Sequence, residues 1–214
     1  MAIPTEKGKK QLVVTIIVVV AIFGGTYSTY LVLQASFHTP IPIVVVTSGS
    51  MEPTIYRGDV LFVKNVPPEE IVAGSHLERT GDVIIYETRG LWASPISEPV
   101  VHRVVNKTFT AGKWYFTTQG DNVITNSNPD LYLVPEDKVY GKVVGIIPQI
   151  GQVKLFLDDT GLAIPLLAFL ALLLVISIIW DYTHPEKKET KQDGTEDPGV
   201  SNPGEPLAPA PAPA

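Results

Sequence analysis

Residues 43–54 read Ile43-Val44-Val45-Val46-Thr47-Ser48-Gly49-Ser50-Met51-Glu52-Pro53-Thr54. The β-branched start predicts a strand, and the proline predicts that no regular element continues past it. Gly49 lies between two serines and lets the backbone turn sharply, so that one hydroxyl and neighbouring N–H groups face a common point. A serine nucleophile with an oxyanion hole requires this arrangement. An ordinary strand-to-turn transition is the alternative, since serine and glycine are common turn residues.

The segment that starts at Ser48, Ser-Gly-Ser-Met-Glu-Pro-Thr, follows an apolar stretch and resembles the nucleophile motif of the type I signal peptidases. Gly-Asp-Val, found at residues 58–60 and again at 81–83 ahead of apolar runs, matches the same family. The resemblance covers most of the chain, up to residues 138–148. It implies a membrane-bound serine endopeptidase that cleaves signal peptides from preproteins after small residues and uses no cofactor.

Two apolar stretches enclose the middle of the chain, and each approaches the 20 or so residues that a membrane span needs. The second carries no charge from Leu162 to Trp180, and its one proline, Pro165, lies in the first turn. We therefore predict transmembrane helices over residues 11–33 and 161–180. A cleavable signal peptide is the alternative for the first, but no Ala-x-Ala sequence follows its apolar core.

Lysines outside the two stretches predict the orientation of the chain. They are Lys7, Lys9 and Lys10 before the first stretch and Lys187, Lys188 and Lys191 after the second. The positive-inside rule then places residues 1–10 and 181–214 in the cytoplasm and a catalytic domain of residues 34–160 outside it. Residues 181–214 hold seven acids and three lysines, a net of −4 out of the chain's −6, and end in a Pro/Ala-rich run. We expect this tail to be disordered.

The composition excludes several functions. The chain has no cysteine, which removes disulfides, thiol catalysis and cysteine-ligated zinc, and no metal site is expected. No basic patch suggests binding to nucleic acid. The expected partners are the lipid bilayer and signal-peptide-bearing preproteins, with a translocon or accessory subunits as further candidates.

Between the apolar stretches the sequence predicts strands rich in β-branched and aromatic residues, separated by turn signals. They cover residues 59–64, 82–87, 100–105, 113–118 and 138–147. Many short strands without a long amphipathic helix predict a mainly β, antiparallel domain, built either as a barrel-like sheet or as two packed sheets.

A serine hydroxyl needs a base, and the histidines are the first candidates. His184 falls on the cytoplasmic side, His38 follows the first helix directly, and His76 lies in a polar loop. His102 is different because it interrupts the apolar run at residues 99–105. It is either the catalytic base or a half-exposed strand residue.

His102 opens the sequence His-Arg-Val. This motif is similar to that of the archaeal and endoplasmic-reticulum branch of the family, whereas the bacterial branch carries a lysine base there. The resemblance therefore implies His102 as base, and the histidine branch together with the absence of cysteine fits a prokaryotic plasma membrane of archaeal type. A serine–lysine enzyme that uses Lys64 or another lysine remains a rival. The rival from another class is a non-catalytic, membrane-tethered subunit of a secretion or signal-peptidase complex.

The family resemblance also implies two aspartates and a second serine. Gly-Asp-Asn contains Asp121, and Asp130 follows nine residues later, where the family has a spacing of about six. We expect Asp130 to orient His102 and Asp121 to serve as a structural or auxiliary acid, but each also lies in a strong turn sequence. Ser48, two residues before Ser50, is expected to donate its hydroxyl to the oxyanion.

Overall fold

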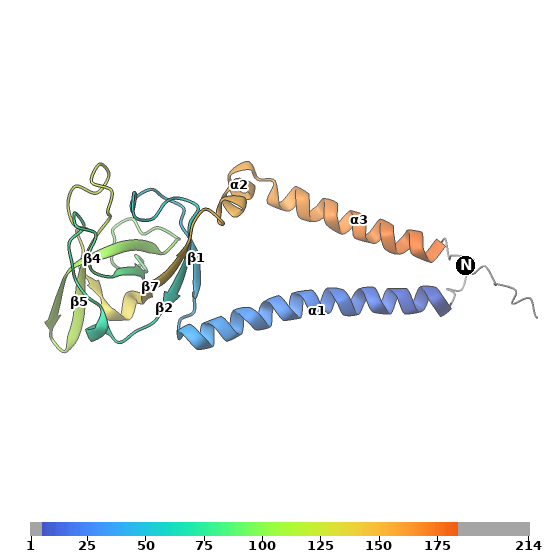
Figure 1. The fold of residues 1–214 in the computed structure, drawn as a ribbon, viewed down its shortest axis with the longest axis horizontal. Coiled ribbons are helices and arrows are strands. Elements are labelled where there is room, and N and C mark those ends of the chain that lie inside the picture. Colours follow the sequence, from blue (N-terminus) through green and yellow to red (C-terminus); the bar gives the residue numbers. More distant parts are fainter. Residues whose placement is uncertain (1–5, 184–214) are drawn as a thin grey trace, which may run out of the picture.

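The computed structural model describes residues 6–183. The predicted disordered tail lies outside this range from residue 184 onward. The helices are α1 (Glu6–Phe37), α2 (Gln152–Thr160) and α3 (Ala163–Thr183), with short 3₁₀ turns η1 (Pro68–Glu70) and η2 (Glu136–Lys138) (Figure 1). The strands are β1 (Ile43–Val45), β2 (Val60–Lys64), β3 (Val83–Tyr86), β4 (Val100–Thr110), β5 (Lys113–Gln119), β6 (Val134–Pro135) and β7 (Val139–Ile147).

The strands form one seven-stranded sheet in the order β1-β2-β7-β3-β4-β5-β6, and every neighbouring pair is antiparallel. The predicted mainly β, antiparallel fold is confirmed. Of the two arrangements considered, the sheet is a half-barrel with free edges at β1 and β6, and it is not divided into two packed layers.

Strand β3 is the centre of the sheet, and all four of its residues are buried. It pairs with β7 on one side and β4 on the other, so it has no edge exposed to water. The pairing with β4 sets Ile84 opposite His102 and Val83 opposite Arg103. His102, which interrupts the apolar run of β4, is therefore paired with the fully buried central strand.

Two groups of buried side chains form the core. The first contains Ile71, Ile84, Tyr86, Val100, Val104, Phe116 and Val134. The second contains Val46, Met51, Ile55, Leu61 and Val83. Three members of the second group come from residues 46–55, so burial of apolar side chains fixes the segment that carries the Ser-Gly-Ser motif.

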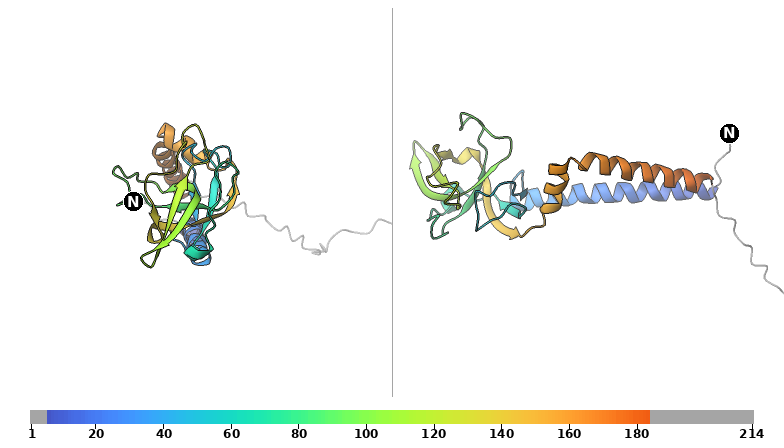
Figure 2. Two further views of the ribbon diagram at one scale, coloured as in Figure 1. Left: turned by 90° about the vertical axis from the view of Figure 1, so that its left-hand side faces the viewer. Right: turned by 90° about the horizontal axis from the view of Figure 1, so that it is seen from above.

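Helices α1 and α3 leave the β-domain on the same side and contact one another (Figures 1 and 2). Each contains a stretch long and apolar enough to cross a membrane, Val13–Phe37 with mean hydropathy 2.0 and Ala163–Trp180 with 2.8. The β-domain is thus flanked by two apolar helices, as predicted. Helix α1 extends past both ends of the predicted span 11–33, whereas α3 begins two residues after, and ends three residues after, the predicted span 161–180. Hydropathy locates the apolar part of a helix and not its ends.

Helix α2 was not predicted, since residues 152–160 were assigned to the β-domain as a whole. It buries only Leu155, and an i,i+4 pair of Lys154 and Asp158 at 2.6 Å supports its exposed face. Gly161 ends it with φ of +68°, a conformation that favours glycine. Val153, Phe156 and Leu157 do recur at the helical spacing i, i+3 and i+4. Over nine residues, however, so short an apolar run does not distinguish a helix from a strand or loop.

The packing of Met51 generates a test of this architecture. Its side chain is 1% exposed, and Met51→Ala should lower the free energy of unfolding by about 2–5 kcal/mol because a core cavity is left behind. Denaturant unfolding of the full chain in lipid nanodiscs, followed by tryptophan fluorescence, measures this. Ile124, 89% exposed, provides the control, and Ile124→Ala should change stability by less than about 0.5 kcal/mol. Equal effects for the two variants would contradict the assignment of residues 46–55 to the core.

Candidate active site

Ser50 lies in a turn shortly after β1 and is half-buried. Its hydroxyl oxygen is 3.4 Å from that of Ser48, and either hydroxyl can be the donor. The turn is held from outside, because the backbone N–H of Asn122 donates to the Ser50 carbonyl at 2.9 Å and its side-chain amide donates to the Gly49 carbonyl at 2.9 Å. Hydrogen bonds from a second loop therefore hold the turn that carries the two serines.

Gly120 explains how the two loops approach so closely. A Cβ atom at this position would lie 2.5 Å from the Ser50 carbonyl oxygen, closer than side chains tolerate. The Gly-Asp-Asn sequence thus provides a residue without a side chain against the turn, and then an asparagine that bonds to it.

His102, on β4, is 5% exposed, and its Nδ1 is 2.6 Å from Asp130 Oδ2. Asp130 lies outside the strands, and its backbone N–H donates to the Thr118 carbonyl at 2.8 Å. An ionised carboxylate can only accept, so His102 carries its proton on Nδ1 and leaves Nε2 free to accept one. This is the tautomer that a general base needs.

Two buried hydroxyls share the Asp130 carboxylate with His102. Thr118 Oγ1 donates to Oδ2 at 2.6 Å, and the Tyr86 hydroxyl donates to the same oxygen at 3.1 Å. Burial raises the pKa of Asp130. The hydrogen bond from His102, the attraction to its protonated form and the hydrogen bonds from the two hydroxyls together hold the pKa of Asp130 below its usual value. Burial, together with the nearby Asp130 carboxylate, raises the pKa of Tyr86 far above its usual value, so the phenol stays protonated and remains a donor.

Asp121 lies elsewhere. Its two oxygens accept from Nε and Nη2 of Arg103 at 2.7 and 2.6 Å, and both side chains are buried. The third guanidinium nitrogen of Arg103 donates to the Gly81 carbonyl at 2.8 Å. The structure therefore brings Asp130 to His102 and pairs Asp121 with Arg103 in a buried ion pair.

A groove of about 480 Å³ joins the candidate residues. Ser48, Ser50 and His102 line it together, and β1 forms one wall. The rest of the lining is mainly apolar: Val44, Val46, Met51, Trp92, Ile96, Pro99, Val100 and Val101. In the part of the chain that the structure describes, no hydrogen bond joins Ser50 to His102; such bonds often form only when substrate is bound. Shape and lining suit an extended apolar peptide.

The other predicted candidates do not reach this groove. Lys64 is exposed on β2 and His38 follows α1, and neither lines the groove. His76 Nε2 lies 3.4 Å from the side-chain amide of Gln119, and His76 does not line the groove. Among residues 6–183, no group of three His, Asp or Glu side chains is arranged to hold a metal ion.

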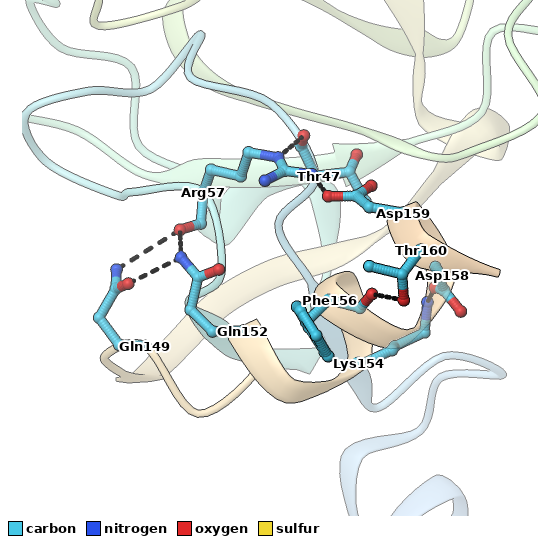
Figure 3. Close-up of polar contacts among 9 residues, drawn as sticks. All are labelled: Thr47, Arg57, Gln149, Gln152, Lys154, Phe156, Asp158, Asp159 and Thr160. Atoms are coloured by element: carbon cyan, nitrogen blue, oxygen red, sulfur yellow. Dashed lines mark hydrogen bonds and ion pairs between the residues drawn. The ribbon is translucent and has the colours of Figure 1, made fainter. Parts of the chain in front are cut away.

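Helix α2 is tied to the segment that leads into the serines (Figure 3). Arg57 donates through Nε to the Thr47 carbonyl at 3.1 Å and through Nη2 to Asp159 at 2.7 Å. Gln152 donates to the Arg57 carbonyl at 2.9 Å. Since α2 is joined to α3 by Gly161 and Leu162, these contacts connect the apolar helix to the candidate nucleophile loop.

Four residues of the site were not predicted from the sequence. Arg103 and Asn122 were inside quoted motifs but were assigned no role. Tyr86 and Thr118 lie in strands, where they look like ordinary β-forming residues. The only available signal for Thr118 was a hydroxyl in a strand otherwise suited to burial, and that is too common a feature to identify a site.

The Arg103–Asp121 pair should be structural. Asp121→Asn keeps the shape of the side chain but leaves a buried guanidinium without its counter-charge, which should destabilise the fold by about 3–5 kcal/mol. Thermal and denaturant unfolding would measure the loss. Asp159→Asn is the matched control, because its pair with Arg57 is exposed and should be worth at most about 1 kcal/mol. A stable Asp121→Asn variant would refute the structural role.

The lowered pKa of Asp130 predicts a pH dependence of stability. A group whose pKa falls on folding stabilises the protein above its unfolded pKa, near 3.8, and loses that contribution as the pH drops through the folded value. Asp130→Asn should therefore be less stable than wild type at neutral pH, and the difference should shrink as the pH falls below about 4. Unfolding curves from pH 7 to pH 3 test this. A difference that does not change with pH would contradict an ionised, hydrogen-bonded Asp130.

Comparison with known proteins places the chain in a family. No family model matches it. The signal peptidase complex catalytic subunit SEC11 of Lachancea thermotolerans is 36% identical over 144 residues, 64% of this chain and 78% of the relative. SEC11 of Saccharomyces cerevisiae (strain YJM789) is 32% identical over 148 residues, 66% of this chain and 81% of the relative. With this identity over more than two thirds of the relatives' length, the chain belongs to the type I signal peptidase family, in its archaeal and endoplasmic-reticulum branch.

Proposed function

We propose that the chain is a membrane-anchored serine endopeptidase that cleaves signal peptides from preproteins, with Ser50 as nucleophile and His102 as general base. The observation that carries the proposal is the 2.6 Å contact of His102 Nδ1 with Asp130 at the groove lined by Ser48 and Ser50. Family membership supports the reaction class, and the geometry supports these roles for the individual residues.

The proposed reaction is an acyl transfer in two halves. Ser50 Oγ attacks the scissile carbonyl while His102 Nε2 takes its proton, and Asp130 stabilises the imidazolium that forms. Ser48 Oγ–H donates to the negatively charged oxygen of the tetrahedral intermediate. The intermediate expels the amine of the mature protein, which takes the proton from His102. Water then attacks the acyl-enzyme by the same route and frees Ser50.

The groove supports an extended substrate. Strand β1 is a sheet edge, and its residues form a wall of the groove, so a peptide can add beside it through backbone hydrogen bonds. The apolar lining suits the hydrophobic part of a signal peptide. We propose that alternate substrate side chains point into this lining, with small residues next to the bond that Ser50 attacks.

Membrane placement completes the proposal. Helices α1 and α3 would anchor the β-domain, and the lysines outside each apolar stretch would place both termini in the cytoplasm and the groove on the far side. We propose the plasma membrane as the site of action. The relatives are named as catalytic subunits of a complex, which makes accessory subunits candidate partners here too.

The deciding experiment is cleavage of a labelled preprotein by the purified full chain in lipid. Wild type should cut after a small residue, while Ser50→Ala should be inactive. Removing one oxyanion donor typically costs about 10²–10³ in rate, so Ser48→Ala should be slowed by that amount. Tyr56→Phe, at an exposed position beyond the turn, serves as control.

The same assay separates the rival mechanisms. His102→Lys should abolish cleavage, because the proposed base is removed from a histidine-shaped site, whereas a lysine-based enzyme should survive the change. Equal cleavage by wild type and Ser50→Ala would exclude Ser50 as nucleophile. A folded wild type that cuts no preprotein would favour the accessory-subunit function.

A further inference from the structure

The Asp130 carboxylate must be held in a precise position although its residue lies outside the strands. It lies on the irregular segment between β5 and β6, yet a group that orients His102 must be held within a fraction of an ångström. The backbone bond from Asp130 N–H to the Thr118 carbonyl fixes the main chain but not the side-chain rotamer. Other groups must therefore hold the carboxylate itself.

Strands on both sides of β4 provide those groups. Side chains alternate between the two faces of a strand, so Tyr86 and Thr118 face the same side of the sheet as His102, near the first core group. Tyr86 comes from β3 and Thr118 from β5, and both are fully buried at 0% exposure. Both hydroxyls donate to Asp130 Oδ2, the oxygen that faces His102, and they lie 3.3 Å from each other.

We infer that Thr118 and Tyr86 are positioning residues for the proposed reaction, and that their hydroxyls hold Asp130 Oδ2 against His102 Nδ1. The inference rests on the proposed function and adds two side chains that touch neither substrate nor the reacting atoms. Thr118 is the stronger support, since its contact is 2.6 Å against 3.1 Å for Tyr86. Both residues lie in hydrogen-bonded strands, whereas Asp130 lies on an irregular segment.

Burial makes the hydroxyls effective. The Asp130 side chain is 11% exposed and the His102 side chain 6%, so water cannot replace a lost donor at full strength. Without Thr118 the carboxylate would lose its closest hydroxyl partner and rotate toward another. Misplacement of Asp130 changes the ring orientation and basicity of His102, and this slows proton transfer without altering how a peptide lies in the groove.

The test is steady-state cleavage of a preprotein by the full chain in lipid. Thr118→Val keeps the shape and burial but removes the hydroxyl. Its kcat should fall about 10- to 100-fold, as expected for losing a hydrogen bond to a charged group, with KM within about twofold of wild type. Thr118→Ser restores the hydroxyl and should recover most of kcat. Tyr86→Phe should show a smaller loss in kcat.

Matched controls separate positioning from packing. Thr117→Val and Tyr115→Phe change neighbouring residues of β5 whose side chains make no hydrogen bond to Asp130, and these variants should leave kcat unchanged. In an Asp130→Asn background, Thr118→Val should have almost no further effect, because its role passes through Asp130.

The inference is overturned if Thr118→Val, shown to be folded by thermal unfolding, keeps kcat within about twofold of wild type. An equal loss in the Asp130→Asn background, or no recovery with Thr118→Ser, would also overturn it. If Thr118→Val does not fold, Thr118→Ala and Tyr86→Phe take its place. The inference is then overturned if both variants cleave the preprotein with the kcat of wild type. Equal cleavage by wild type and Ser50→Ala would instead refute the proposed function, so the two failures are distinguishable.

Discussion

The alternation of side chains along β4 is the constraint on which the site depends. His102 and Arg103 are adjacent, so a strand must send them to opposite faces of the sheet. Each meets its own aspartate there, His102 with Asp130 and Arg103 with Asp121. A shift of β4 by one residue against β3 would exchange the two environments and separate both pairs. The buried β3 strand, paired on both edges, prevents that shift.

The two aspartates illustrate how one residue type serves two purposes. Asp121 meets a permanently charged guanidinium inside the sheet, where neither partner can be removed without exposing the other to an apolar interior. Asp130 meets an imidazole that gains and loses a proton, beside a groove. Both ion pairs are buried. The difference in role between the two aspartates therefore comes from the partner residue and not from the amount of burial.

Much of the fold followed from the sequence, because β-branched runs separated by Gly-Asp and Gly-Lys turns are local signals. The strands predicted at residues 100–105 and 138–147 needed no tertiary information to be recognised, and the second begins one residue later in the structure, at Val139. The short strand β6 and helix α2 were not predicted, since two residues cannot show a period and the apolar run of the nine-residue α2 is too short to identify a helix. Motifs identified Ser48, Ser50 and His102 as candidates. The choice between Asp121 and Asp130 as neighbour of His102 depended on three-dimensional distance, and the roles of Thr118 and Tyr86 depended on cross-strand register, which no spacing along the chain reveals.

The loop between Gly-Asp-Asn and Asp130 is attached to the rest of the domain at both ends, so its length can change without moving the site. At one end of the loop Asn122 hydrogen-bonds to the serine turn, and at the other end the backbone N–H of Asp130 donates to the Thr118 carbonyl. Val123 and Ile124, between these ends, are exposed. Added residues extend into solvent and leave both ends in place. The spacing of nine residues therefore needs no compensating change in the sheet. The same reasoning makes this loop a suitable place to insert a peptide tag or a fluorescent label.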